Sequence, residues 1–253
     1  MKKTILSILI AAVTVASSQA QLLYDHNLYS WTAGNIVGQN TWAAHSGAAA
    51  VPIQVTSNGA VTLVQGANSR EDVNFNIGTL QSNTTYYFGM THSLIASTTP
   101  TTTYFAHFLG STSIFSARLF VASTGTNGQY TLGLSNAGSS PDAGLTWSTP
   151  LLNGTSYNLI IGYNTANGIA SLWVDPTSIS STSISTAIST PPVLQAIALR
   201  QGSGNTTHTI TDMAAGTNFD SVLQAIPEPS SSMLMVLGAG ALVGIRSLRR
   251  KQS

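Results

Sequence analysis

Apolar and polar residues alternate in short runs along the middle of the chain, and clusters of Gly, Asn, Ser and Pro separate these runs. Alternation with a period of two is typical of β-strands, because successive side chains of a strand point to opposite faces. In the segment 171–174, this pattern places Leu172 and Val174 on one face and Trp173 on the other. A neighbouring run predicts a shared face for four residues: Tyr157, Leu159, Ile161 and Tyr163.

The pattern predicts roughly a dozen strands and few or no helices. The clearer strands are expected at Tyr86–Ile95, Tyr104–Leu109, Arg118–Ala122, Gln129–Leu134, Tyr157–Tyr163, Ile169–Val174, Val193–Arg200 and His208–Met213. Weaker candidates lie at Leu22–Tyr24, Pro52–Val55, Val61–Val64 and Val73–Ile77. A chain with this many strands is expected to form two large antiparallel sheets packed face to face, so the predicted fold class is an all-β sandwich over residues 21–225.

Residues 176–192 form a low-complexity segment of mainly Ser, Thr, Ile and Pro. We interpret this segment as a long surface loop. The alternative is that Ile179, Ile184 and Ile188 fix it against the edge of a sheet.

The N-terminus has the three parts of a secretory signal peptide. Lys2 and Lys3 precede an apolar run, and small residues follow it up to Ala20. We predict a signal peptide over residues 1–20, export through the secretory translocon, and cleavage by signal peptidase between Ala20 and Gln21. The alternative, a buried N-terminal helix, does not explain the order of these three parts.

The C-terminus, residues 226–253, has a second three-part pattern. A Pro-Glu-Pro triplet comes first, an uncharged apolar stretch follows, and a basic cluster lies near the end: Pro227, Glu228 and Pro229, then Met233–Ile245, then Arg249, Arg250 and Lys251. From Ser230 to Ile245 the chain has 16 uncharged residues, which as a helix are slightly shorter than the ~30 Å hydrocarbon core of a membrane. The three serines and a snorkelling Arg246 are expected to make up the difference, and the basic end is expected to stay in the cytoplasm. We therefore predict a single transmembrane helix. A plain tail anchor behind a Pro-rich linker is the alternative.

This C-terminal pattern resembles the PEP-CTERM sorting signal of Gram-negative bacteria. The resemblance implies recognition of Pro227, Glu228 and Pro229 by exosortase, a membrane protease-transpeptidase. It also implies membrane retention by Arg249, Arg250 and Lys251, followed by release from the cell or transfer to its surface. Proline restricts the residue before it to extended conformations, which suits a protease that binds its substrate as a strand.

Charge changes this picture in one respect. Charged residues make up 7% of the chain, and the formal net charge of +1 comes from the two basic ends. Residues 21–226 contain three Arg, no Lys and seven acids. A mildly acidic middle segment repels phosphate backbones, which argues against nucleic acid as a partner. Cysteine is absent, which excludes disulfides and thiolate metal sites.

The strands themselves carry a second resemblance. The segment 171–176 after an Asn-Gly hairpin, the segment 198–202, and the segment 210–222 are similar to the final strands of concanavalin A-like, laminin-G-like jelly rolls. The resemblance covers most of residues 22–224. It implies a lectin-like sandwich.

Jelly-roll glycosidases of this class use two carboxylates one or two residues apart on a strand, about 5 Å from each other for retention. Here Glu71 is followed directly by Asp72, and neighbours on a strand point to opposite faces. No catalytic residue is therefore predicted. We interpret the other acids of the domain as turn and cap residues.

Other candidate sites are weaker. No two of the five histidines have metal-binding spacing, although His92 and His107 are placed to face one another across a sheet. Calcium is a candidate ligand, because Asp142, Asp175, Asp212, Asn218 and Asp220 are oxygen donors expected in loops. Trp147 lies in an apparently exposed loop and is a candidate carbohydrate contact, whereas aromatic residues more often fill cores.

Together these features predict an exported protein of the cell surface or extracellular matrix. Its sandwich is expected to be structural or associated with extracellular polysaccharide, and not catalytic. The alternative is a secreted glycoside hydrolase or lyase with a degenerate carboxylate site that uses Glu71 or Asp72.

Overall fold

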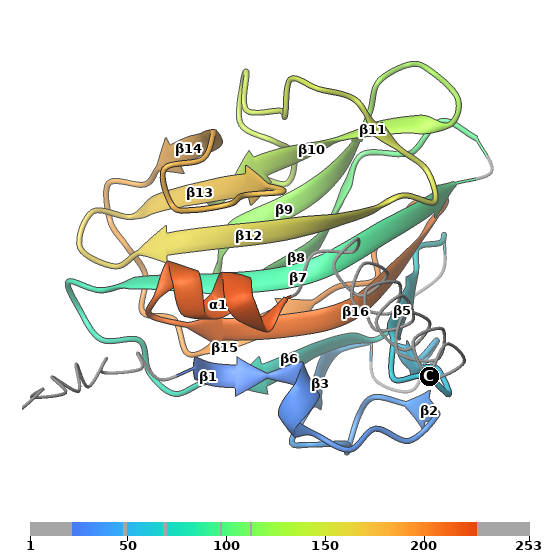
Figure 1. Ribbon diagram of the computed structural model, residues 1–253, viewed down its shortest axis with the longest axis horizontal. Coiled ribbons are helices and arrows are strands. Elements are labelled where there is room, and N and C mark those ends of the chain that lie inside the picture. Colours follow the sequence, from blue (N-terminus) through green and yellow to red (C-terminus); the bar gives the residue numbers. More distant parts are fainter. Residues whose placement is uncertain (1–21, 48–49, 68–69, 97, 112, 227–253) are drawn as a thin grey trace, which may run out of the picture.

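Two antiparallel sheets lie face to face and make up most of the structure (Figure 1). The computed structural model describes residues 22–47, 50–67, 70–96, 98–111 and 113–226 of the 253-residue chain. Within these ranges, the described helices are the short 3₁₀ helix η1 (His26–Leu28) and α1 (Phe219–Ala225). The predicted all-β, two-sheet antiparallel sandwich is confirmed.

The first sheet, which we call sheet A, has nine strands. In spatial order they are β14 (Ser183–Ala187), β13 (Ile169–Val174), β12 (Ser156–Asn164), β7 (Thr85–Ala96), β16 (Thr206–Gly216), β5 (Val61–Val64), β4 (Gln54–Val55) and β2 (Gly34–Asn35), and β1 (Leu22–Asp25) also pairs with β16. The long strands β7 and β16 form the centre, and a bulge lies between Ile210 and Asp212.

The second sheet, sheet B, has seven strands. In spatial order they are β11 (Leu151–Leu152), β10 (Gln129–Ser135), β9 (Phe115–Ser123), β8 (Thr103–Leu109), β15 (Ala196–Leu199), β6 (Asp72–Asn76) and β3 (Ala43–Ser46). Register shifts on both sides of Ala106 in β8 turn Phe105 and Ala106 toward the core, and they leave Tyr104 and His107 on the other face.

The core between the sheets consists of the alternating apolar residues that the sequence predicts. Leu159, Ile161 and Tyr163 of β12 are fully buried there, and Tyr157 packs against them at the margin. In β13, Leu172 and Val174 face this core, whereas Trp173 belongs to a separate cluster on the outer side of sheet A. Both predicted alternations are confirmed.

One expectation about the chain is wrong in part. Residues 183–187 of the low-complexity segment are not loop, because they form the edge strand β14, which pairs with β13. Cross-strand contacts such as that between the hydroxyls of Ser171 and Ser185, 2.8 Å apart, allow a strand without a strong apolar face at the edge of a sheet. Attachment to the sheet edge is therefore correct for residues 183–187, where Ile184 packs against the core, whereas Ile179 is exposed.

Part of the outer side of sheet A is covered by α1, which lies over β7 and β16 (Figure 1). Its buried residues Phe219 and Val222 join Tyr87, Trp173 and Ile226 in a second apolar cluster. Asn218 caps this helix by accepting a hydrogen bond from the backbone N–H of Ser221.

The predicted signal peptide, Pro-Glu-Pro triplet, transmembrane helix and basic cluster lie outside the described residues. Among the residues that are described, neither helix has the length and apolar character to cross a membrane.

Candidate functional site

The outer face of sheet B has a different character from the α1-covered face of sheet A. Two of the three arginines in the described ranges project from it, and both guanidinium groups lie over one ring. Arg200 Cζ is 4.2 Å and Arg118 Cζ is 5.0 Å from the centroid of the Tyr104 ring, and Arg118 also lies 4.9 Å from the Phe115 ring. We call Tyr104, Phe115, Arg118 and Arg200 the arginine–tyrosine cluster. All four side chains are half-buried.

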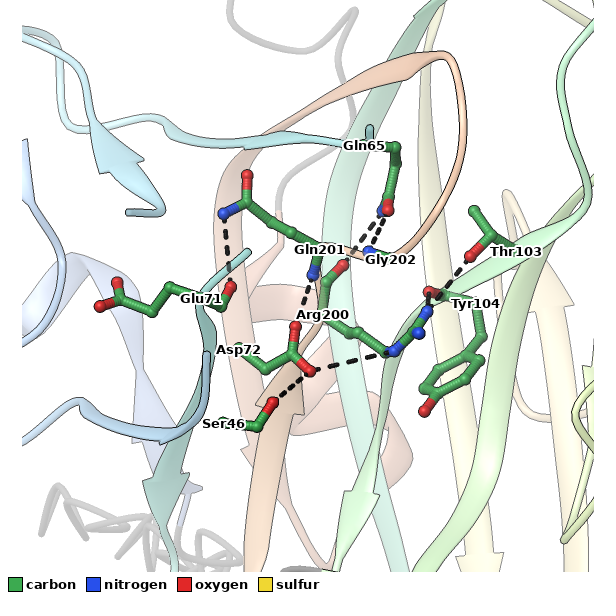
Figure 2. Close-up of polar contacts among 9 residues, drawn as sticks. All are labelled: Ser46, Gln65, Glu71, Asp72, Thr103, Tyr104, Arg200, Gln201 and Gly202. Carbon is green, nitrogen blue, oxygen red and sulfur yellow. Dashed lines mark hydrogen bonds and ion pairs between the residues drawn. The ribbon is translucent and has the colours of Figure 1, made fainter. Parts of the chain in front are cut away.

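Arg200 is positioned by the end of β15 and by the segment that follows it (Figure 2). Its backbone N–H donates to the Phe105 carbonyl, and its Nη1 donates to Thr103 Oγ1 at 3.2 Å. The side chain folds back over Gly202, where a Cβ atom would lie 1.9 Å from Nη1. A larger residue at position 202 is therefore incompatible with this rotamer of Arg200.

Asp72 is the acidic partner in the cluster (Figure 2). Its carboxylate accepts hydrogen bonds from Ser46 Oγ at 2.8 Å and from the backbone N–H of Gln201 at 2.9 Å, and Arg200 Nε lies 3.9 Å away. Burial nevertheless raises the pKa of Asp72, because the loss of solvation outweighs the two hydrogen bonds and the long ion pair. One carboxylate faces two guanidinium groups, so Asp72 offsets at most one of their two positive charges.

Arg118 is held from the opposite side of the cluster by the chain that follows β10. Its Nη1 donates to the carbonyl of Gly138 at 2.6 Å. Pro141 in the same segment packs closely on Gly133 of β10, since a Cβ at position 133 would meet it at 2.5 Å. Partial burial lowers the pKa of Arg118 from its usual value, but an arginine remains charged at any physiological pH.

His107 lies beneath the cluster and is fully buried. Its ring is 5.5 Å from Tyr104, 4.9 Å from Phe115 and 6.0 Å from His45, and neither ring nitrogen has a hydrogen-bond partner among the described residues. Burial, together with His45 and the two arginines, holds the pKa of His107 well below its usual value. His107 is therefore neutral near pH 7, and the positive charge of this face comes from Arg118 and Arg200.

The predicted relation between His92 and His107 is wrong. His92 lies in β7, and its Nε2 is 3.0 Å from Nδ1 of His208 in β16, in the interior of the sandwich. His107 belongs to the outer face of the other sheet. The register of β7 with β16 explains this contact. His208 lies opposite Leu94 and His92 lies opposite Ile210, so the two histidines are diagonal neighbours on the same face of the sheet.

Glu71 and Asp72 behave as their adjacency predicts. The Glu71 side chain is buried, and its carboxyl group points away from that of Asp72 (Figure 2). Three of the five oxygen donors considered for calcium make local hydrogen bonds. Asp142 accepts hydrogen bonds from Ser135 and Thr186, Asp175 accepts from the backbone of Asn158, and Asn218 caps α1. Within the described ranges, no three His, Cys, Asp or Glu residues lie together as a metal site would require.

Trp147 lies outside the named strands, and the residues on both sides of it are exposed, as the sequence suggests, but its own side chain is not fully exposed. It is half-buried and packs against the main core, and its backbone extends sheet B beyond β10. The Trp147 N–H donates to the Leu132 carbonyl at 2.7 Å, and the Trp147 carbonyl accepts from Thr131 Oγ1 at 2.6 Å. Its role as a carbohydrate contact stays a prediction.

Comparison with protein-family models finds one match, at the C-terminus. Residues 225–251 match the PEP-CTERM protein-sorting motif. The predicted sorting signal is confirmed. The PEP-CTERM motif indicates an exported protein that is sorted to the cell surface by an exosortase. No curated protein matches the chain.

Solved structures similar to this chain include lectins and lyases of the concanavalin A-like jelly-roll kind. The Emp47p carbohydrate recognition domain is 9% identical, with 71% of this chain and 89% of that chain covered and a TM-score of 0.41. Peanut lectin is 14% identical, with 73% and 95% covered and a TM-score of 0.47. An alginate lyase from Alteromonas is 11% identical, with 70% and 95% covered and a TM-score of 0.44. Binding proteins and enzymes both occur among them, and at this similarity neither activity transfers to the chain.

The arginine–tyrosine cluster escaped sequence reasoning. Its members come from β8, from β9 and from the end of β15, and the two bulges of β8 bring them to one face. The one available signal in the sequence is the scarcity of cations, because residues 21–226 contain only three arginines. The structure places two of these three over the same ring.

Proposed function

We propose that this sorted protein is a non-catalytic, glycan-associated component of the cell surface or extracellular matrix. We further propose that its sandwich contacts glycans through the arginine–tyrosine cluster. The observation that carries the proposal is the placement of Arg118 and Arg200 over one half-buried aromatic ring on a sheet face that no described helix covers.

The chemistry of the cluster supports a sugar ligand that bears negative charge. A guanidinium group offers a planar set of N–H donors that matches a carboxylate or sulfate, and aromatic rings pack against the apolar face of a sugar ring. Asp72 compensates one of the two cations at most, so this face keeps a local positive charge on a domain whose acids outnumber its basic residues. Electrostatic attraction then favours acidic polysaccharides over neutral ones.

Affinity electrophoresis through gels that contain acidic or neutral polysaccharides tests this proposal. We expect the mature sandwich to be retarded by an acidic polysaccharide, and we expect Tyr104→Ala and Arg118→Ala to lose most of that retardation. Arg70→Ala is the matched control, because it removes the same charge from a guanidinium group that packs against Gly66 instead. Equal loss in Arg70→Ala and Arg118→Ala, or no retardation on any gel, contradicts the proposal.

The alternative is a hydrolase or lyase that uses Glu71 or Asp72. The divergent carboxyl groups of these residues support the non-catalytic proposal, since paired-carboxylate hydrolysis needs both groups at one bond. A reducing-sugar assay on the same polysaccharides, together with an absorbance assay for the unsaturated products of a lyase, separates the two. Turnover that Glu71→Gln or Asp72→Asn abolishes would establish the enzyme instead.

A further inference from the structure

The sorting triplet begins one residue after a fully buried position. Ile226 is 0% exposed, and the next residue in the chain is Pro227. A protease that binds its substrate as an extended strand requires several residues around its recognition motif to be free of other contacts. The residues immediately before the triplet, in contrast, are helical up to Ala225 and pack on sheet A.

The packing of this C-terminal helix depends on a glycine in the central strand. A Cβ atom at Gly89 of β7 would lie 2.7 Å from Val222 Cγ1 and 2.9 Å from Ile226 Cδ1. Real Cβ atoms do not approach other atoms so closely, so an alanine at position 89 displaces these side chains. Gly89 therefore permits the close seat of α1 on the sheet.

A buried asparagine fixes the end of the helix. Asn158 Nδ2 donates to the backbone carbonyl of Ile226 at 3.0 Å, which is the carbonyl of the bond to Pro227. Asn158 is itself held by Thr91, whose hydroxyl donates to Asn158 Oδ1 at 2.9 Å, and by Asp175, which accepts from its N–H at 2.7 Å. The side-chain amide of Asn158 is thus oriented by Thr91 of the neighbouring strand β7.

We propose that α1 and Ile226 form a latch that controls access of the exosortase to the sorting motif. In the docked state, the carbonyl before Pro227 is bound to Asn158, and the two preceding turns are helical. The protease therefore acts on the fraction of molecules in which the latch has left sheet A, and the stability of the docked latch sets the rate of processing. This inference concerns the sorting step and is independent of the proposed glycan binding.

The latch is tested by pulse–chase measurement of processing of the full-length chain in a host that contains an exosortase. Gly89→Ala is expected to speed processing by roughly tenfold, since it pushes Val222 and Ile226 off the sheet. A flexible Gly-Ser linker of about ten residues between Ile226 and Pro227 is expected to speed processing by a similar factor. Gln224→Ala, on the exposed side of the same helix, is the matched control and should leave the rate unchanged.

Combining the two changes makes the inference decisive. Once the linker separates the motif from Ile226, Gly89→Ala should have no additional effect on the rate. Hydrogen exchange on the purified variants should show faster exchange in α1 and intact protection in sheet A. If Gly89→Ala unfolds the whole sandwich, the protection of sheet A against hydrogen exchange disappears. In that case the processing rate of the linker variant alone tests the latch. Processing of the linker variant at the rate of the unmodified chain overturns the latch.

Discussion

The two outer faces of the sandwich differ in chemical character: that of sheet A has an apolar cluster beneath α1, and that of sheet B has two arginines over aromatic rings. The face of sheet A is apolar and covered, with Phe219 in contact with Tyr87 and Trp173 at ring distances of 5.4 and 5.1 Å. The face of sheet B carries two cations over half-buried rings and no described helix. The comparison teaches that the two sheets use their outer faces differently. Sheet A buries Phe219 and Val222 of α1 on its outer face, whereas sheet B has a smaller buried cluster of Leu109, Ala196 and Ala198 beside the half-buried arginine–tyrosine cluster.

The largest expected effect is that of acidification, which should lower the free energy of unfolding because it protonates histidines that are buried and neutral in the folded protein. His92, His107 and His208 are fully buried, and burial lowers the pKa of all three, that of His92 to about 3. An unfolded histidine binds a proton near pH 6.5, so the stability that these neutral rings contribute is present above that pH and is lost as the pH falls below it. Each ring lowers the free energy of unfolding by ~1.4 kcal/mol per pH unit in this range, so the three together lower it by about 4 kcal/mol per pH unit.

Urea unfolding between pH 7 and pH 4.5 measures this slope. His107→Phe removes the one ring of the three that belongs to the outer face of sheet B, and it should reduce the slope by about one proton while leaving the interior pair of His92 and His208 in place. A free energy of unfolding that does not change between pH 6.5 and 5.5 would contradict the expected pH dependence.

The covered face should be more sensitive to truncation than the uncovered one. Phe219→Ala removes a buried ring from the α1 cluster and should lower the free energy of unfolding by about 3 kcal/mol. Tyr104→Ala removes a half-buried ring from sheet B and should cost about 1 kcal/mol or less. Urea unfolding at pH 7.5 compares them directly, and equal losses would show that the arginine–tyrosine cluster is structural.

Salt should act on one face only. If retardation by an acidic polysaccharide depends on Arg118 and Arg200, raising the ionic strength from about 0.05 M to 0.5 M should abolish it, because exposed charges are screened over a few ångströms at high salt. The free energy of unfolding should stay constant over the same range, since α1 and the interior are held by apolar contacts. Retardation that persists at 0.5 M would indicate a ligand held by stacking alone.

The sequence predicted the sheets better than it predicted their outer faces. Strand positions and the opposite orientations of Leu172 and Trp173 follow from a local period of two, which any buried strand must obey. The helix α1 was missed because seven residues are too few to show a helical period. The cluster was missed because it depends on the bulges around Ala106, which no local pattern announces.

The smallest expected effect concerns Asp72, and it separates the electrostatic role of the cluster from any structural one. The pKa of Asp72 is raised in the folded state, so its ionised form makes folding less favourable as the pH rises above ~4, and Asn removes this cost. Asn also loses the 3.9 Å ion pair with Arg200, but such partly exposed pairs contribute ~0–1 kcal/mol. Asp72→Asn should therefore change the free energy of unfolding by about 1 kcal/mol or less, while the extra unit of positive charge increases retardation by acidic polysaccharides at low salt. If Asp72→Asn is strongly destabilised, the ion pair between Asp72 and Arg200 has a structural role. If the variant is stable but its retardation is unchanged, the polysaccharide binds to another face of the protein.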